Sequence, residues 1–238
     1  MKHLFYLLLL VIVPFFTSHA QESEGFSSDP RLLTDFTLAS IGSGNAVALS
    51  LHRMHPIAFK KRFAIGYGIR FTGFYGQDNG FVTAPAKVSE GNFFKKQNEA
   101  KLDTLYLAHS SVGSINASIH LEYRFTSRIS AEFNIDALGW SFGADRWGRF
   151  EALSRNQPIT SQSAKVTPLN LLLTGDYDIG SLNSELSLNI HVTDNLLVRP
   201  GVSFVFTEFT THNKLEFNND RFRKKSLLPM IGVSYRIR

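Results

Sequence analysis

The stretch that most constrains the fold is residues 112–135, where polar and apolar side chains alternate along two arms joined by a tight turn at Thr126-Ser127. In the first arm, Ile119 and Phe125 lie on the apolar face, whereas Glu122 lies on the polar face. The second arm repeats this division. Strict alternation with a period of two predicts a β-hairpin. An apolar, aromatic face opposite a face with charges of both signs is typical of a strand between lipid and a polar barrel interior.

The beginning of the chain has the pattern of a secretory signal peptide. The basic residue Lys2 precedes the apolar run 4–16, and small residues lead to Ala20. This pattern predicts a signal peptide at residues 1–20 that is cleaved after Ala20. The apolar run is too short to span a membrane comfortably as a helix. The chain has no cysteine, which excludes a lipoprotein anchor, disulfides and thiolate chemistry.

After the signal peptide we expect two parts: a short polar periplasmic lead-in at residues 21–34 and one barrel domain at residues 35–238. The formal net charge of the whole chain is +5, and its basic and acidic residues are spread along the strands. Nucleic-acid binding is not expected, because it needs a clustered basic face. No apolar run in the domain approaches the length of a spanning helix. Membrane insertion is therefore expected as a closed barrel, in which the strands satisfy one another's backbone groups.

A weak repeat of the form (Ile/Val)-Gly-Ser-x-Asn begins at residues 41, 112 and 179, and each copy leads into a hairpin. In the first copy the apolar phase slips by one, so that Val47 and Leu49 face outward, and this slip predicts a bulge. The predicted strands are 46–53, 63–76, 113–125, 128–135, 182–192, 198–206 and 227–238, and residues 35–41 supply an eighth. In the third hairpin, Leu182, Leu188, Phe204 and Phe206 are predicted to face lipid, and Glu185 and Arg199 to face inward.

The connections alternate in length. The predicted turns are residues 55–61, 126–127 and 193–195, and the predicted long loops are residues 77–102, 151–165 and 212–224. Short turns on one side and long loops on the other are typical of outer-membrane barrels. We therefore predict an all-β fold: a closed antiparallel transmembrane β-barrel of about eight strands, with short periplasmic turns and long extracellular loops.

The last strand, Met-Ile-Gly-Val-Ser-Tyr-Arg-Ile-Arg at residues 230–238, carries a family resemblance. Its outward residues Tyr235 and Ile237 resemble the terminal signal that the barrel insertion machinery recognises, although the usual final Phe is absent. Residues 35–238 resemble the small outer-membrane β-barrel proteins of Bacteroidota and, broadly, the OmpA-type barrel domain. This resemblance implies a location in the outer membrane of a Gram-negative bacterium, in contact with lipid and lipopolysaccharide. It implies no reaction, because small barrels have many roles.

Seven charged side chains are predicted to point into the barrel and form an interior network: Arg70, Glu122, Arg124, Glu132, Glu185, Arg199 and Arg236. Eight strands enclose a lumen that side chains alone can fill. Isolated buried charges are costly, so we predict an ion-paired, plugged interior, with Arg124 close to Glu132 on the neighbouring arm. A conducting pore is the alternative.

Two groups of residues have the composition of a chemical site. Ser118, His120 and Glu122 share a face and have the residue types of a hydrolase triad, but inward polar residues recur at every second position and a triad is defined by geometry. His52 and His55 lack a third metal ligand at standard spacing and fit an interfacial turn. We predict no catalytic residue, metal or cofactor.

The predicted outer rim holds two further groups. An aromatic cluster, Trp140, Phe142, Trp147 and Phe150, is predicted to belong to the outer aromatic girdle, with surface binding as the alternative. A basic run, Arg221, Arg223, Lys224 and Lys225, either contacts lipopolysaccharide phosphates or lies on a solvated loop.

The leading functional interpretation is a non-enzymatic envelope protein that is structural or binds an unknown extracellular ligand through its long loops. The alternatives are a narrow channel or transporter for small solutes and, third, a lipid-modifying barrel enzyme.

Overall fold

The computed structural model describes residues 29–42, 44–58, 62–88, 98–173 and 177–237. The predicted signal peptide and residues 21–28 of the predicted lead-in lie outside this part of the chain. Among the described residues, no helix has both the length and the apolar character needed to cross a bilayer.

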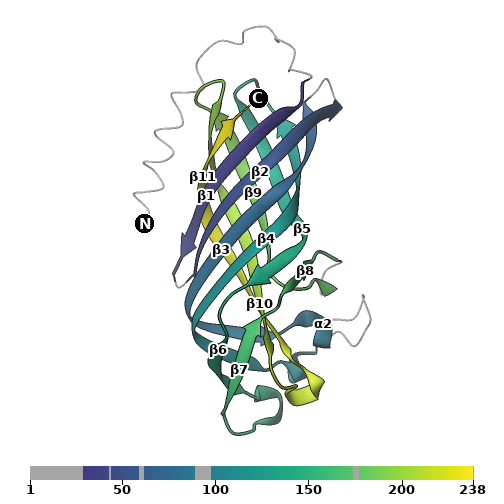
Figure 1. The fold of residues 1–238 in the computed structure, drawn as a ribbon, viewed down its shortest axis with the longest axis vertical. Coiled ribbons are helices and arrows are strands. Elements are labelled where there is room, and N and C mark those ends of the chain that lie inside the picture. The colour runs from purple at the N-terminus through teal and green to yellow at the C-terminus, as the bar shows by residue number, and fades with distance from the viewer. Residues whose placement is uncertain (1–28, 43, 59–61, 89–97, 174–176, 238) are drawn as a thin grey trace.

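Eight strands form a closed antiparallel ring (Figure 1). In ring order they are β1 (Arg31–Ile41), β2 (Gly44–Ala58), β3 (Phe63–Thr83), β4 (Thr104–Arg124), β5 (Ile129–Phe142), β9 (Leu182–His191), β10 (Leu196–Thr211) and β11 (Arg221–Arg236). The pairing of β11 with β1 closes the ring. The predicted barrel is confirmed, and β1 begins four residues before the expected start at Asp35 because Arg31 already pairs with Met54.

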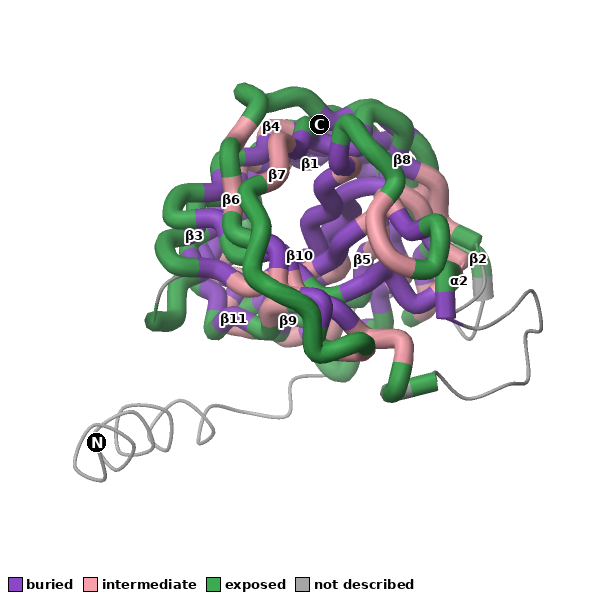
Figure 2. Tube along the Cα trace, turned by 90° about the horizontal axis from the view of Figure 1, so that it is seen from below, coloured by how far each residue is buried: buried purple, intermediate pink, exposed green. Residues whose placement is uncertain are grey.

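The faces of the strands follow the alternation in the sequence. Leu188 and Phe204 are 49% and 37% exposed on the outside, whereas Glu185 and Arg199 are buried inside. The same division holds in the hairpin of β4 and β5, where Glu122 pairs in register with Glu132. Figure 2 shows buried and exposed segments alternating around the ring. The barrel is therefore apolar outside and polar inside over most of its length.

A second, smaller ring is built on one end of the barrel, and we call it the cap. The ends of β3, β4, β10 and β11 are joined there by β6 (Arg146–Glu151) and β7 (Thr160–Val166). β4 pairs with β6, β6 with β7, β7 with β10, and β11 with β3, so six strands close a ring of their own. The cap occupies the lower end of Figure 1, opposite the start of β1 and the end of β11.

The cap has an apolar core. Its aromatic side chains pack edge to face, with ring centroids 5.0 Å apart for Phe81 and Phe209 and 5.8 Å apart for Phe150 and Phe222. The core extends into the adjoining end of the barrel, and it also includes Phe74, Leu105, Leu107, Val112, Ala164, Val166, Val205 and Leu228. Burial of these side chains stabilises the cap as it would a water-soluble barrel.

The predicted bounds of the three long loops are therefore partly wrong. Residues 77–83 and 221–224 continue β3 and β11, and residues 160–165 form most of β7. The continuation of β3 was hidden by a change of phase at Asp78, whose φ is +45°. Inward residues are even-numbered up to Gly76 and odd-numbered from Asn79 onward. Asp tolerates this left-handed conformation better than most residues.

Short elements complete the described connections: α2 (Pro85–Val88), η2 (Glu99–Lys101), η3 (Leu153–Arg155), η5 (Glu216–Asn218) and β8 (Leu169–Leu171), which pairs with β5. The predicted turn at residues 55–61 is shorter than expected, because β2 extends to Ala58. The predicted bulge in the first hairpin is also displaced. Pairing is continuous around Val47, and the register shifts between Pro56 and Ala58, where proline lacks a donor for the ladder.

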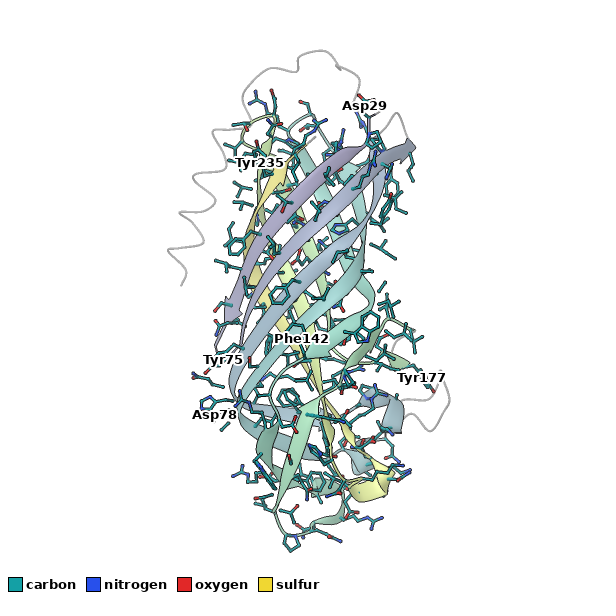
Figure 3. The ribbon with its side chains drawn as sticks, viewed as in Figure 1. Asp29, Tyr75, Asp78, Phe142, Tyr177 and Tyr235 are labelled. Atoms are coloured by element: carbon teal, nitrogen blue, oxygen red, sulfur yellow. The ribbon has the colours of Figure 1, made fainter. Side chains whose placement is uncertain are left out.

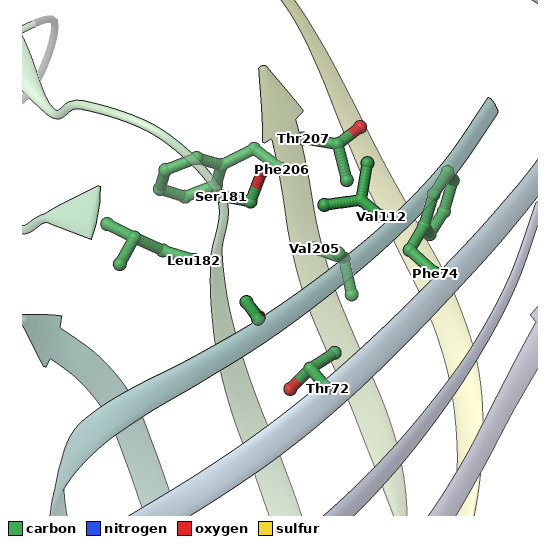
Figure 4. Close-up of a pocket in the computed structure, with 9 residues that line it drawn as sticks. Thr72, Phe74, Val112, Ser181, Leu182, Val205, Phe206 and Thr207 are labelled. Atoms are coloured by element: carbon green, nitrogen blue, oxygen red, sulfur yellow. The ribbon is translucent and has the colours of Figure 1, made fainter. Parts of the chain in front are cut away.

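Leu182 and Phe206 were predicted to face lipid and are instead buried. Both line a cavity of about 10 Å³ that also touches Phe74 and Val112, at the boundary between the polar interior and the apolar core (Figure 4). A cavity of that size holds about one water molecule. The lipid-facing pattern therefore ends earlier at β9 and β10 than the sequence suggested.

Candidate functional site

Buried charged side chains contact one another across the lumen of the eight-stranded ring. Arg199, on β10, forms an ion pair with Asp35 of β1 and a second with Glu132 of β5, at 3.3 Å between Nη2 and Oε1. Its Nη2 also lies 3.8 Å from Oε2 of Glu185. β1 and β5 stand on opposite sides of the ring, four strands apart in either direction. The contacts of Arg199 therefore span the lumen.

A second arginine fills the interior next to the cap. Arg70, on β3, donates from Nε to Oδ1 of Asp136 at 2.8 Å and from Nη2 to the Asn183 carbonyl at 2.6 Å. Its Nη1 lies 3.5 Å from Oε2 of Glu185. Glu185 therefore connects the two arginines, and it also accepts a hydrogen bond from Thr37 at 3.0 Å. Each charge has a partner of opposite sign, which offsets the cost of its burial.

The remaining predicted interior charges lie near the mouth at the end with the termini. Glu122 forms an ion pair with Arg31 and lies 3.6 Å from Nε of Arg124. Arg236 shares this inward face and is partly exposed. The predicted pairing of Arg124 with Glu132 is wrong. Glu132 contacts Arg199 and His120 instead. Strand stagger carries Glu132 towards β10, which the sequence pattern of one hairpin does not reveal.

One row of polar contacts has the geometry of a catalytic triad. The Ser118 hydroxyl lies 2.9 Å from Nε2 of His120, and Nδ1 of His120 lies 2.9 Å from Oε1 of Glu132. The sequence suggested Glu122 as the acid, but Glu122 accepts a hydrogen bond from Ser130. Ser118 is buried among ion-paired side chains, and it lines neither the 10 Å³ cavity nor the surface groove described below. A triad needs a substrate beside its nucleophile, so we assign no catalysis to this row.

His52 joins this row from β2. It is buried, and its ring stacks on that of His120 with centroids 4.0 Å apart and planes 9° apart. His55, which the sequence grouped with it, stacks on Tyr67 instead, at a centroid distance of 5.6 Å. Odd and even positions of a strand face opposite ways, so the two histidines cannot share a site.

The basic run at the start of β11 does not form one exposed patch. Arg221 and Arg223 form ion pairs with Glu208, at 2.7 and 2.8 Å, and both donate to the Asp178 carbonyl. They therefore hold residues 178–181 against the cap. Lys224 donates to Asn79, and its partial burial lowers the pKa of its ammonium group. Lys225 is exposed. Glu208 engages both arginines, which leaves Lys225 as the exposed member of the run, and the contact with lipopolysaccharide stays a prediction.

The other predicted rim residues fall into two groups. Trp140, Phe142 and Trp147 are exposed, as a girdle requires, whereas Phe150 lies in the cap core because β6 turns that side chain inward. At the opposite end, Tyr235 and Ile237 are exposed on the outer face of β11 (Figure 3 labels Tyr235). Their recognition by the insertion machinery stays a prediction.

The far end of the cap carries a groove of about 320 Å³. It lies between the connection of β6 to β7 and the connection of β10 to β11, and most of its lining side chains are polar. The lining residues are Phe150, Ala152, Gln157, Pro158, Thr160, Gln162, Lys214, Leu215 and Glu216. Phe217, next to this lining, has a φ of +53° and lies under the guanidinium of Arg155, 4.7 Å from the ring centroid. Residues held in uncommon backbone conformations cluster at active sites and ligand-binding sites.

Sequence reasoning missed Arg31, Asp35, His52 and Asp136 as interior residues. Arg31 and Asp136 lie just beyond the predicted strands 35–41 and 128–135, whereas Asp35 and His52 lie within predicted strands whose inward residues were not assigned. The register shift opposite Ala117 and Ser118 changes the phase of β5, whose buried residues are even-numbered up to Asp136 and odd-numbered from Gly139 onward. The predicted strand ends therefore explain the omission of Arg31 and Asp136 only.

The eight-stranded ring, with its lipid-compatible exterior and its polar interior, is a transmembrane β-barrel of the outer-membrane type. No family model matches the sequence, and no curated protein matches it. The chain is similar to Neisserial surface protein A (10% identity, TM-score 0.38, 87% of this chain and 96% of that one). It is also similar to the attachment invasion locus protein Ail of Yersinia pestis (9%, 0.37, 89% and 100%) and to a major outer membrane protein of Thermus thermophilus (10%, 0.38, 88% and 100%). Similarity at this level carries no argument about function, and the fold rests on the strand pairing itself.

Proposed function

We propose that this protein is a non-conducting, non-enzymatic protein of the bacterial outer membrane, whose barrel anchors a cap that binds ligands at the cell surface. The proposal rests on one observation: side chains block the path through the barrel at two successive levels. A network of ion pairs spans the lumen within the barrel, and an apolar core fills the cap beyond it.

The proposed orientation places the termini in the periplasm and the cap outside the cell. It is supported by the short turns next to the termini and the long excursions at the opposite end. The signal-peptide pattern and the resemblance of the last strand to small Bacteroidota and OmpA-type barrels agree with it. The predicted contacts with lipid, lipopolysaccharide and the insertion machinery belong to this proposal.

Planar-bilayer recording separates the proposed function from a channel. Reconstituted protein should give no steady conductance, because ions would have to pass both the ion-paired network and the cap core. A general porin in the same bilayer serves as the positive control. Uniform, stable steps from the unmodified protein would place transport first.

The surface-binding part of the proposal rests on the groove of the cap. Its amide, hydroxyl and charged side chains suit a polar ligand such as a glycan better than an apolar one. Labelled proteoliposomes should bind selected members of a glycan array or purified lipopolysaccharide. A Lys214→Ala, Glu216→Ala variant should lose this binding, and Lys225→Ala, which lies outside the groove lining, should retain it. Equal signals from all three proteins, or none from the unmodified protein, would remove the groove from the proposal and leave a structural role.

Lipid analysis addresses the enzymatic alternative. Because Ser118 is buried, membranes from cells with and without the protein should have the same lipid composition. A lipid species that depends on the protein and on Ser118 would contradict a non-enzymatic role.

A further inference from the structure

We propose that the barrel interior binds one divalent transition-metal ion through His52, His120 and Glu132. These three residues come from β2, β4 and β5, and a donor atom from each lies within 4.8 Å of the other two. All three side chains are buried: His52 is 2% exposed, His120 0% and Glu132 4%. Two imidazoles and a carboxylate are the donors that zinc and its first-row neighbours prefer, whereas calcium and magnesium prefer oxygen alone.

His52 provides an independent indication of a missing ligand. Neither of its ring nitrogens has a hydrogen-bond partner among the described residues, and the nearest acid oxygen, Oδ2 of Asp35, is 3.5 Å from Nδ1. Oδ1 of Asp35 also lacks a partner there. Buried polar atoms without partners are costly and uncommon in folded proteins. Here an unsatisfied imidazole and an unsatisfied carboxylate oxygen belong to neighbouring side chains.

The charge balance at this level of the barrel favours a cation. Four carboxylates, those of Asp35, Glu132, Asp136 and Glu185, meet two guanidiniums, those of Arg70 and Arg199. With neutral histidines the difference is 2 − 4 = −2. Nearer the mouth, Arg31, Arg124 and the partly exposed Arg236 outnumber Glu122, so the excess of negative charge is local to the level of His52, His120 and Glu132.

The existing hydrogen bonds are already suited to a metal ligand. Replacing the proton shared by Nδ1 of His120 and Oε1 of Glu132 with an ion would leave Nε2 of His120 to donate to the Ser118 hydroxyl, 2.9 Å away. Metal-bound histidines usually donate their second ring N–H to such a partner. His52 would then turn out of its stack to supply the second nitrogen, and the unsatisfied Oδ1 of Asp35 is a candidate for a fourth ligand. Ser118 is on this account a positioning residue for the metal ligand rather than a nucleophile.

Metal retention by the folded barrel tests this proposal. Untagged mature protein is refolded in detergent with Co²⁺ or Zn²⁺, washed with a chelator, and measured for metal content and for the visible absorption of tetrahedral Co²⁺. The wild type should retain about one ion per chain with the tetrahedral spectrum. His52→Gln and His120→Gln should lose both signals, and Ser118→Ala should weaken affinity by about 10-fold.

Two controls make the outcome specific. His55→Gln removes a histidine on the same strand that lies outside the network, and His212→Gln removes an exposed histidine paired with Asp145; both should retain the ion. Heat-modifiable gel mobility shows that each variant is folded. If His52→Gln or His120→Gln does not fold, X-ray absorption of the Zn²⁺-loaded wild type decides, with two imidazole nitrogens at about 2.0–2.1 Å expected. Failure of the folded wild type to retain metal, retention by His52→Gln equal to wild type, or fewer than two imidazoles would each overturn the proposal.

Discussion

The barrel and the cap share four strands, β3, β4, β10 and β11, yet their interiors are filled with opposite kinds of side chain. In the barrel these strands present Arg70, Ser118 and Arg199 to the inside, whereas in the cap they present Phe81, Leu105 and Phe209. The exterior changes in the opposite sense, from Ile69 and Leu227 to Gln77 and Lys225. The surrounding solvent explains the difference, because lipid outside leaves the polar positions to point inward, and water outside leaves the apolar ones to do so.

The largest effect is expected from breaking the ion-pair network. Arg199→Leu would leave the carboxylates of Asp35, Glu132 and Glu185 without their shared cation. We expect a loss of about 3–5 kcal/mol in the free energy of unfolding, measured by urea titration in detergent. Arg128→Leu, in an exposed turn, should change it by less than about 0.5 kcal/mol. Equal small losses would mean that Arg199 is solvated in a wet lumen.

The matching change in the cap removes a core aromatic ring. Phe209 is fully buried against Phe81, so Phe209→Ala should cost about 3–5 kcal/mol through lost burial and the cavity left behind. Limited proteolysis should cut the cap of this variant first, while the barrel keeps its heat-modifiable mobility. Trp147→Ala, at a site 75% exposed, is the control and should remain resistant. Simultaneous loss of both regions would show that they fold as one unit.

An arginine substitution on the outer surface should have different effects in the barrel and in the cap. Leu188→Arg should cost about 2–4 kcal/mol if the residue lies near the bilayer midplane. Leu153→Arg, at an exposed site in η3 of the cap, should cost almost nothing because water solvates the new charge. Folding titrations into liposomes measure both. A harmless Leu188→Arg would contradict the assigned lipid face.

The smallest effect should come from an ion pair on the surface of the cap. Lys87 lies 3.1 Å from Asp220, and both side chains are partly exposed. Lys87→Ala should cost at most about 1 kcal/mol, and that cost should vanish in about 1 M salt, where screening is strong. The cost of Arg199→Leu should persist in the same salt because that pair is buried. Unfolding titrations at two salt concentrations compare them directly.

The sequence predicts the barrel well because apolar and polar residues alternate along each lipid-facing strand, and this alternation shows which side chains face lipid. Glu122, Glu132 and Arg199 could be placed inside from that pattern alone. The partners of these residues could not be predicted in this way. Arg199 and Asp35, for example, are 164 residues apart in the sequence, and their contact depends on the stagger of the strands in the closed ring. The cap was missed for two reasons: the phase changes at Asp78, and β6 and β7 are short strands whose partners on β4 and β10 are distant in sequence.

The interior histidines illustrate the same limit at the level of a site. The sequence offers His52 beside His55 and His120 beside Glu122, and both groupings are wrong. The contacts that matter run between strands, from His52 to His120 and from His120 to Glu132. Every second residue along one strand shares a face, and most contacts between these side chains are made with the strands beside it.

Single-cysteine labelling tests the central claim, that the barrel holds packed polar side chains rather than water, and the chain offers a background without native cysteines. Ser203→Cys places the thiol in the interior, Val202→Cys on the adjacent lipid face and Ser127→Cys in an exposed turn. In liposomes, a charged thiol reagent should modify Ser127→Cys rapidly and the other two only slowly, and an apolar maleimide should also reach Val202→Cys. Modification of Ser203→Cys by the charged reagent as fast as that of Ser127→Cys would show a water-filled lumen and contradict the account.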